Sequence, residues 1–155
     1  MTDLAKQIRA FIHKAMQMRD TNVDFEDIEK VKVLLYVHFG IHALRPLKPL
    51  FFEKSTGDLV EIDQRKFASK EEIFKKYHVF DPDLTFKLAG KTAVVEIDGD
   101  VHWQNSNSVR RTNLRNETYS QAGITMLWLT RENVRTLDVK DLVPLISQQL
   151  GIKIG

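Results

Sequence analysis

The chain has 155 residues, which suits one domain with a sizeable buried core. It contains no cysteine, which excludes disulfides, thiolate-bound metals and a cysteine nucleophile. Its formal net charge of +2 is too small to indicate a nucleic-acid partner without knowing where the charges lie. No apolar run reaches membrane-spanning length and the N-terminus lacks a signal-peptide pattern, so we expect a cytoplasmic protein with no membrane partner.

Two helices are predicted in the first forty residues. The first covers Leu4–Met18, where apolar residues recur at helical spacing. The second covers Phe25–Phe39, with Asp24 as its cap and Gly40 as its stop. The later half of this second segment, Val31–Val37, favours a strand if propensity alone is considered. We therefore expect N-terminal helices packed on the core, with a strand as the alternative at that one place.

A hairpin and a short helix are predicted next. Leu47–Glu53 and Leu59–Asp63 have strand composition and flank a turn at Ser55–Asp58. Ser69, followed three residues later by glutamate, is a capping-box pattern that opens a helix ending near Tyr77.

The most informative part of the sequence follows, in two segments that read as adjacent strands. In the first, Val79–Phe86, Asp83 precedes alternating apolar residues, and in the second, Ala93–His102, Glu96 and Asp98 alternate with aliphatic side chains. Glu96 and Asp98 therefore share one face, and a hairpin brings Asp83 near them. Crowded carboxylates repel each other unless a cation lies between them, and divalent cations prefer oxygen ligands. The pattern predicts a metal site.

The C-terminal third is predicted to complete an α/β fold. A helix from Ser106 to Gly123 leads to an apolar strand, Ile124–Thr130, and a last helix covers Asp141–Leu150, where Pro144 is tolerable only in the first turn. A helical crossover makes the last strand parallel to the strand of Glu96. We expect a mixed β-sheet core flanked by helices, in one domain.

This set of motifs resembles the restriction-endonuclease-like superfamily of metal-dependent nucleases. It is most similar to the branch of very-short-patch-repair endonucleases and of homing endonucleases with a Glu-Asp-x-His-Asp type of site. The match covers Tyr77–Thr130 and rests on Pro82-Asp83, Glu96-Ile97-Asp98-Gly99, His102, Arg115-Asn116, Gly123 and Ile124-Thr125-Met126-Leu127. The chain departs from the broader pattern in carrying Asp98 where a lysine is usual.

The resemblance implies a catalytic site. Asp83 and Glu96 would bind Mg²⁺ or Mn²⁺ directly, and Asp98 would hold a second metal or a metal-bound water. His102 would act as general base or protonate the leaving oxygen. In the patch-repair branch an acid from an N-terminal helix joins the site, and Glu29 or Glu26 would fill that place here.

The resemblance also suggests a DNA-binding surface. Arg110, Arg111 and Arg115 lie close together on the predicted helix, and Asn105 adds a neutral donor. Trp103 is a candidate to stack on a base or to wedge into a duplex.

These residues lead to two functional hypotheses. The first is a hydrolase, a metal-dependent endonuclease that cleaves DNA as a monomer or a homodimer. The alternative is a non-catalytic module on a degenerate nuclease fold that binds nucleic acid or a protein, and the missing lysine favours it. The clustered acids favour the nuclease, because a surface that only binds phosphates gains nothing from them.

Overall fold

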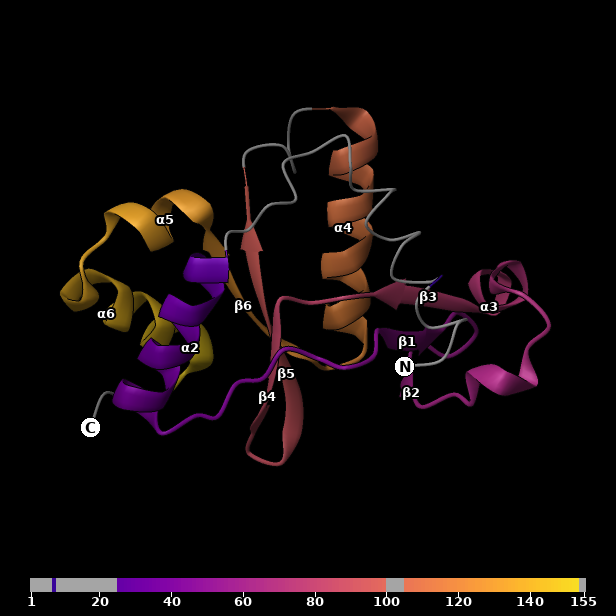
Figure 1. The fold of residues 1–155 in the computed structure, drawn as a ribbon, viewed down its shortest axis with the longest axis horizontal. Coiled ribbons are helices and arrows are strands. Elements are labelled where there is room, and N and C mark those ends of the chain that lie inside the picture. The colour runs from indigo at the N-terminus through magenta and orange to yellow at the C-terminus, as the bar shows by residue number, and fades with distance from the viewer. Residues whose placement is uncertain (1–6, 8–24, 100–104, 154–155) are drawn as a thin grey trace.

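A computed structural model describes Gln7, residues 25–99 and residues 105–153. The helix predicted at Leu4–Met18 therefore lies outside the described residues except at Gln7, and His102 and Trp103 lie outside them altogether. The described part combines two three-stranded sheets with five α-helices, so the predicted α/β class is confirmed (Figure 1). No helix in this part of the chain is long and apolar enough to cross a membrane.

The first described element is helix α2, Phe25–Phe39, with the bounds that the sequence predicts. Gly40 follows with a φ of 65°, a left-handed conformation that favours glycine and ends the helix. The strand alternative for Val31–Val37 was wrong. Val31 and Leu35 are fully buried one helical turn apart, which is the spacing of a core-facing helix stripe.

The first sheet has the order β2-β1-β3. The predicted hairpin is confirmed: β1, Leu50–Glu53, pairs antiparallel with β2, Leu59–Val60. A 3₁₀ turn at Gln64–Lys66 then leads to helix α3, Lys70–Lys76. The predicted cap is present too, because the Ser69 hydroxyl accepts a hydrogen bond from the Glu72 amide at 3.3 Å.

Strand β3, Tyr77–Phe80, corrects one expectation. The sequence suggested a single strand through Val79–Phe86 beside the strand of Glu96. Instead, β3 pairs antiparallel with β1, and a new strand begins only at Leu84. Pro82 lies between the two strands and lacks the amide hydrogen that a continuous ladder needs, so the chain changes sheets here. Asp83 consequently stands just before the second sheet.

The second sheet has the order β4-β5-β6 and is mixed, as predicted. β4, Leu84–Leu88, pairs antiparallel with β5, Lys91–Asp98, through a turn at Ala89-Gly90. β6, Thr125–Thr130, pairs parallel with β5. The connection between the two parallel strands contains α4, Ser106–Gln121. This arrangement makes β5 the central strand.

Two helices follow β6. α5, Arg131–Thr136, was not predicted, although the Thr130 hydroxyl caps it by accepting from the Asn133 amide at 3.0 Å. α6, Val139–Leu150, begins earlier than expected, so Pro144 falls beyond the first turn and that expectation was wrong. Pro144 removes the donor to the Lys140 carbonyl, and both residues are exposed, so water can replace the lost hydrogen bond.

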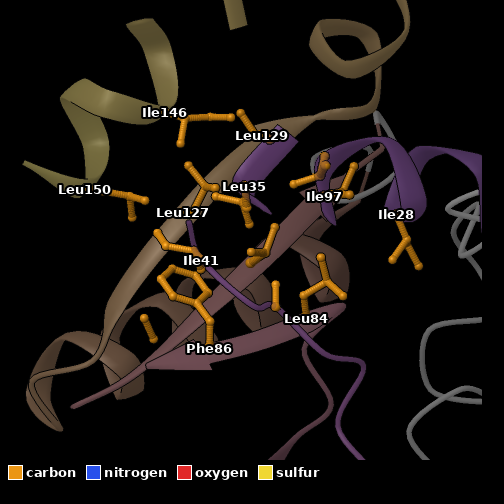
Figure 2. Packing of buried hydrophobic residues seen from close by; sticks show 14 of the residues in the cluster. Ile28, Leu35, Ile41, Leu84, Phe86, Ile97, Leu127, Leu129, Ile146 and Leu150 are labelled. Carbon is orange, nitrogen blue, oxygen red and sulfur yellow. The ribbon is translucent and has the colours of Figure 1, made fainter. Parts of the chain in front are cut away.

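The two faces of β5 are both buried but differ in chemistry. Ala93, Val95 and Ile97 point into the main hydrophobic core with residues of α2, α5, α6, β4 and β6 (Figure 2). Val94 points the other way and packs with Phe52, Phe80 and Tyr119 of β1, β3 and α4. A strand buried on both faces is typical of a central position with a parallel neighbour. The face that also carries Glu96 and Asp98 therefore lies beneath α4.

An ion pair joins α2 to α5. Asp27 is 6% exposed, and its Oδ2 lies 3.1 Å from Nη2 of Arg135 and 3.9 Å from Nε of Arg131. Asp27→Ala is expected to lower the free energy of unfolding by about 2 kcal/mol, because it removes a hydrogen-bonded charge from beside two arginines. Urea unfolding measures this change. Glu132→Ala, at an exposed position on α5, is the control and should alter stability by less than about 0.5 kcal/mol.

Candidate active site

The pairing of β4 with β5 brings Asp83 near Glu96. Leu84 of β4 pairs with Val95 of β5, so the next residues outward are Asp83 and Glu96. The Asp83 amide donates at 3.1 Å to the carbonyl of Val95, the residue that already pairs with Leu84, so the regular ladder ends here. The Asp83 carboxylate Oδ2 accepts from the Ile97 amide at 2.7 Å. The carboxylate of Asp83 lies close enough to Glu96 to raise the pKa of Glu96 by charge repulsion, so the two acids come together at this end of the sheet.

Arg115 of α4 lies against the two acids of β5. Its Nη1 donates to Glu96 Oε2 at 3.1 Å and to Asp98 Oδ1 at 3.0 Å, and its Nη2 donates to Asp98 Oδ2 at 2.8 Å. The contact with Asp98 is thus bidentate, whereas the contact with Glu96 is single. All three residues are buried, with exposed fractions of 4%, 5% and 2% for Arg115, Glu96 and Asp98. A bidentate, charge-assisted contact of this kind is strong, and it also fixes the orientation of both side chains.

Three further side chains complete the hydrogen bonding. The Tyr119 hydroxyl donates to Glu96 Oε1 at 3.1 Å, and the Trp128 indole Nε1 donates to Asp98 Oδ2 at 2.7 Å. Asn116 Oδ1 accepts from Nε and Nη2 of Arg115 at 3.1 and 3.0 Å. Both oxygens of Glu96 and both of Asp98 therefore have a donor. Buried polar groups require such pairing, so this network is part of the folded core.

The position of Trp128 is itself fixed by the protein. Trp128 lies on the outer strand β6, and Gln149 of α6 pairs with its backbone there. The Trp128 amide donates to Gln149 Oε1 at 2.7 Å, and Gln149 Nε2 donates to the Trp128 carbonyl at 2.8 Å. The structure shows Trp128 partly buried and holding Asp98 in place.

The cluster carries more negative than positive charge. Burial of its carboxyl raises the pKa of Asp83 to about 7, with Asp98 adding to the effect and the Ile97 hydrogen bond opposing it. Burial likewise raises the pKa of Glu96 to about 8, although Arg115 and Tyr119 lower it. Burial alone would lower the pKa of Arg115, but Glu96 and Asp98 outweigh it and raise that pKa. The cluster therefore favours binding protons or a cation.

The donor chemistry of the cluster fits an oxygen-preferring cation such as Mg²⁺ or Mn²⁺. Asp83 and Glu96 present carboxylates from adjacent strands, and hard divalent cations take such ligands. Asp98 fits less well as a ligand, because the Arg115 fork and Trp128 already bind both of its oxygens. Among the residues that the structure describes, no three acids or histidines are arranged as a ready metal cage. A cation at Glu96 would have to share that carboxylate with Arg115.

The predicted DNA-binding residues occupy quite different environments. Arg115 is buried in the cluster and does not form one exposed face with Arg110 and Arg111. Arg110 is exposed and bonds Asn107 Oδ1 at 2.7 Å. Arg111 is partly buried, its guanidinium lies 5.7 Å from the centre of the Phe80 ring, and burial lowers its pKa. Asn105 caps α4 by accepting from the Ser108 amide at 2.9 Å. Of the candidates that the structure describes, Arg110, Arg111 and Asn105 retain exposed surface.

Glu29 is not brought to the cluster by any contact among the described residues. It lies on α2, which packs with the aliphatic face of β5 rather than with the acid face. Its carboxylate is 4.0 Å from the ammonium of Lys32, and its side chain is 42% exposed. Glu26, the other candidate, is exposed at the start of the same helix. The helix-start preference for acids accounts for both residues.

Sequence reasoning missed Tyr119 as a partner of Glu96. The available signal was the helical spacing of Arg115 and Tyr119, which are four residues apart and so share a face of α4. A tyrosine on the same face as an arginine, in a helix that follows an acid-bearing strand, could have been assigned to the cluster.

No family model matches the chain, and no curated protein or solved structure is similar enough to count as a match. The resemblance to restriction-endonuclease-like nucleases therefore rests on the sequence motifs alone.

Proposed function

We propose that this protein is a metal-dependent endodeoxyribonuclease of the restriction-endonuclease-like type. One observation carries the proposal: the carboxylates of Asp83, Glu96 and Asp98 lie close together beneath α4, and the guanidinium of Arg115 contacts two of them, Glu96 and Asp98. Among the described residues Asp83 has no ion pair within contact distance, although the charges of Arg115 and Arg45 act on it and lower its pKa. Keeping uncompensated carboxylates inside a protein costs stability, so such a cluster is more often a functional site than a structural one.

In this proposal Asp83 and Glu96 hold the cation. A bound Mg²⁺ or Mn²⁺ would neutralise charge that develops on a phosphodiester and would lower the pKa of an attacking water. Asp98 orients Arg115 through its bidentate contact, and Tyr119 orients the carboxylate of Glu96. His102, outside the described residues, is assigned proton transfer from the resemblance alone.

DNA is the proposed substrate because cations also lie on α4, above the acid face. Arg110 is exposed and Arg111 partly so, and they lie on the same helix as Arg115. Phosphate contacts from such residues position a duplex without reading its sequence. Trp103 and Asn105 remain candidates for contacts near the start of this helix.

The direct test is incubation of the protein with labelled DNA in several forms: duplex, nicked, mismatched, branched and single-stranded. Cleavage with Mn²⁺ or Mg²⁺, and none with chelator, is the expected result. Absence of cleavage on every form, with both metals, would contradict the nuclease. Nicking and double-strand cleavage distinguish a monomer from a homodimer acting on both strands.

Arg111→Ala is expected to weaken DNA binding on all sequences and to reduce the slope of log affinity against log salt by about one unit. Fluorescence anisotropy at several salt concentrations, with EDTA to prevent cleavage, measures this slope. Lys140→Ala is the control, because that exposed residue lies on α6, which packs with β6 and α2. An unchanged slope for Arg111→Ala would show that Arg111 does not contact a phosphate. Its role would then be to pack against the ring of Phe80.

A non-catalytic binding module is the second candidate, and Arg115 is the observation that favours it. Its guanidinium already neutralises part of the charge that a metal would neutralise. A protein that binds labelled DNA with EDTA but cleaves none of the forms with either metal would fit this second function.

A further inference from the structure

Arg115 is unusual because every donor of its guanidinium is used inside the protein. Nε donates to Asn116, Nη1 to Glu96 and Asp98, and Nη2 to Asp98 and Asn116. None of these partners is a solvent-exposed surface acid, and the side chain is 5% exposed. An arginine held in this way is not available for a phosphate without breaking contacts. Its task lies within the cluster.

The contacts of Arg115 divide into an anchor and one exchangeable bond. Asp98 and Asn116 together receive four of its hydrogen bonds, and Trp128 orders Asp98 from the other side. Glu96 receives one hydrogen bond, from Nη1, which also serves Asp98. Loss of the bond to Glu96 would therefore leave the arginine anchored. Glu96 keeps Tyr119 as a donor and is free to turn one oxygen to another cation.

We propose that Arg115 is an internal counter-ion that holds the cluster together without metal and competes with the divalent cation for Glu96. The inference rests on the proposed function, because it concerns the same cation. It adds a regulation of that site. Arg115 lowers the affinity for metal, because a cation that binds Glu96 must displace the hydrogen bond between Arg115 and Glu96. Asp83, which Arg115 does not contact directly in the described network, is the ligand that first receives the cation.

The test compares Mn²⁺ binding by three variants, measured by calorimetry without DNA. Arg115→Met removes the charge and keeps the length of the side chain. It is expected to bind Mn²⁺ about tenfold to a hundredfold more tightly than the parent, the range for losing one charge-assisted competitor. Arg65→Met, at a position with a side chain that is 79% exposed and outside the cluster, is the matched control and should bind like the parent. The metal-free Arg115→Met protein should also melt at a lower temperature, and Mn²⁺ should restore its melting temperature.

Arg115→Lys keeps the test decisive if the methionine variant does not fold without metal. Lysine retains the charge but has a single terminal nitrogen, so it cannot contact Glu96 and Asp98 together in this geometry. The Mn²⁺ affinity of Arg115→Lys should therefore exceed that of the parent, by a smaller factor than in Arg115→Met. The proposal would be overturned if the folded Arg115 variants bind Mn²⁺ no more tightly than the parent does. It would also be overturned if neither the variants nor the parent bind Mn²⁺ at all. Cleavage is a separate readout: tighter metal binding without any cleavage would support the counter-ion and contradict the nuclease.

Discussion

Glu96→Gln is expected to lower the rate of DNA cleavage by at least about a thousandfold, and Asp83→Asn by a similar factor. Each substitution removes a charged ligand from a metal that supplies several kcal/mol of transition-state stabilisation, and about 1.4 kcal/mol corresponds to a tenfold change in rate. Single-turnover cleavage with saturating Mn²⁺ measures the effect. Neither change alters the size of the side chain, so the core packing around β5 should be preserved.

The control for these variants is Asp58→Asn, an exposed acid in the turn between β1 and β2. It should cleave at the parental rate. Circular dichroism and urea unfolding must show that the two site variants fold, and both should be at least as stable as the parent near pH 8, since each removes a carboxylate from a crowded buried cluster. Parental activity in both site variants would show that Asp83 and Glu96 are not the ligands.

The second large effect concerns pH. The pKa values of Asp83 and Glu96 are raised by burial to about 7 and about 8, so the folded protein binds more protons than the unfolded chain at intermediate pH. Stability contributed by these groups is therefore present at low pH and is lost as pH rises from about 4 towards about 8. The free energy of unfolding falls by up to about 1.4 kcal/mol per pH unit for each proton that the folded protein binds and the unfolded chain does not. Urea midpoints between pH 5 and pH 9, measured with EDTA, test this slope.

Two comparisons isolate the contribution of the cluster from that of other titrating groups. Glu96→Gln should show a flatter dependence than the parent, because one of the raised groups no longer titrates. Excess Mg²⁺ should flatten the parental curve as well, since a cation replaces the protons that the cluster otherwise binds. A parent and a Glu96→Gln variant with the same slope would show that Glu96 is ionised throughout this range.

The sequence predicted the elements whose periodicity is strong. The bounds of α2 follow from an apolar stripe and a terminal glycine, and the parallel pairing of β5 with β6 follows from the helix that joins them. The meeting of Asp83 and Glu96 was predictable because antiparallel neighbours share a face. Each of these inferences needs only local pattern and general geometry.

The environment of Arg115 was not predictable in the same way. The buried face of α4 consists largely of polar residues, Ser108, Thr112, Arg115 and Thr118, so no apolar stripe marks which side of the helix faces the sheet. A polar stripe reads as solvent-facing unless the acids beneath it are already known. The change of sheet at Pro82 was missed for a different reason. Asp81, Pro82 and Asp83 do interrupt the strand composition of Val79–Phe86, but nothing in the sequence shows that the first part of this segment pairs with β1.

The hydrogen bond from the Ile97 amide to Asp83 has a spectroscopic consequence. This amide donates at 2.7 Å to a carboxylate rather than to a neighbouring strand's carbonyl, and the bond itself lowers the pKa of Asp83. A short bond to an ionised oxygen deshields the amide proton, and protonation of that oxygen or its capture by a cation weakens the effect. The single backbone resonance of Ile97 thus records the ionisation of a buried carboxyl group that has no nuclear label of its own. An ordinary ¹⁵N-labelled sample would allow protonation of Asp83, or binding of a cation to it, to be followed in solution without any substitution.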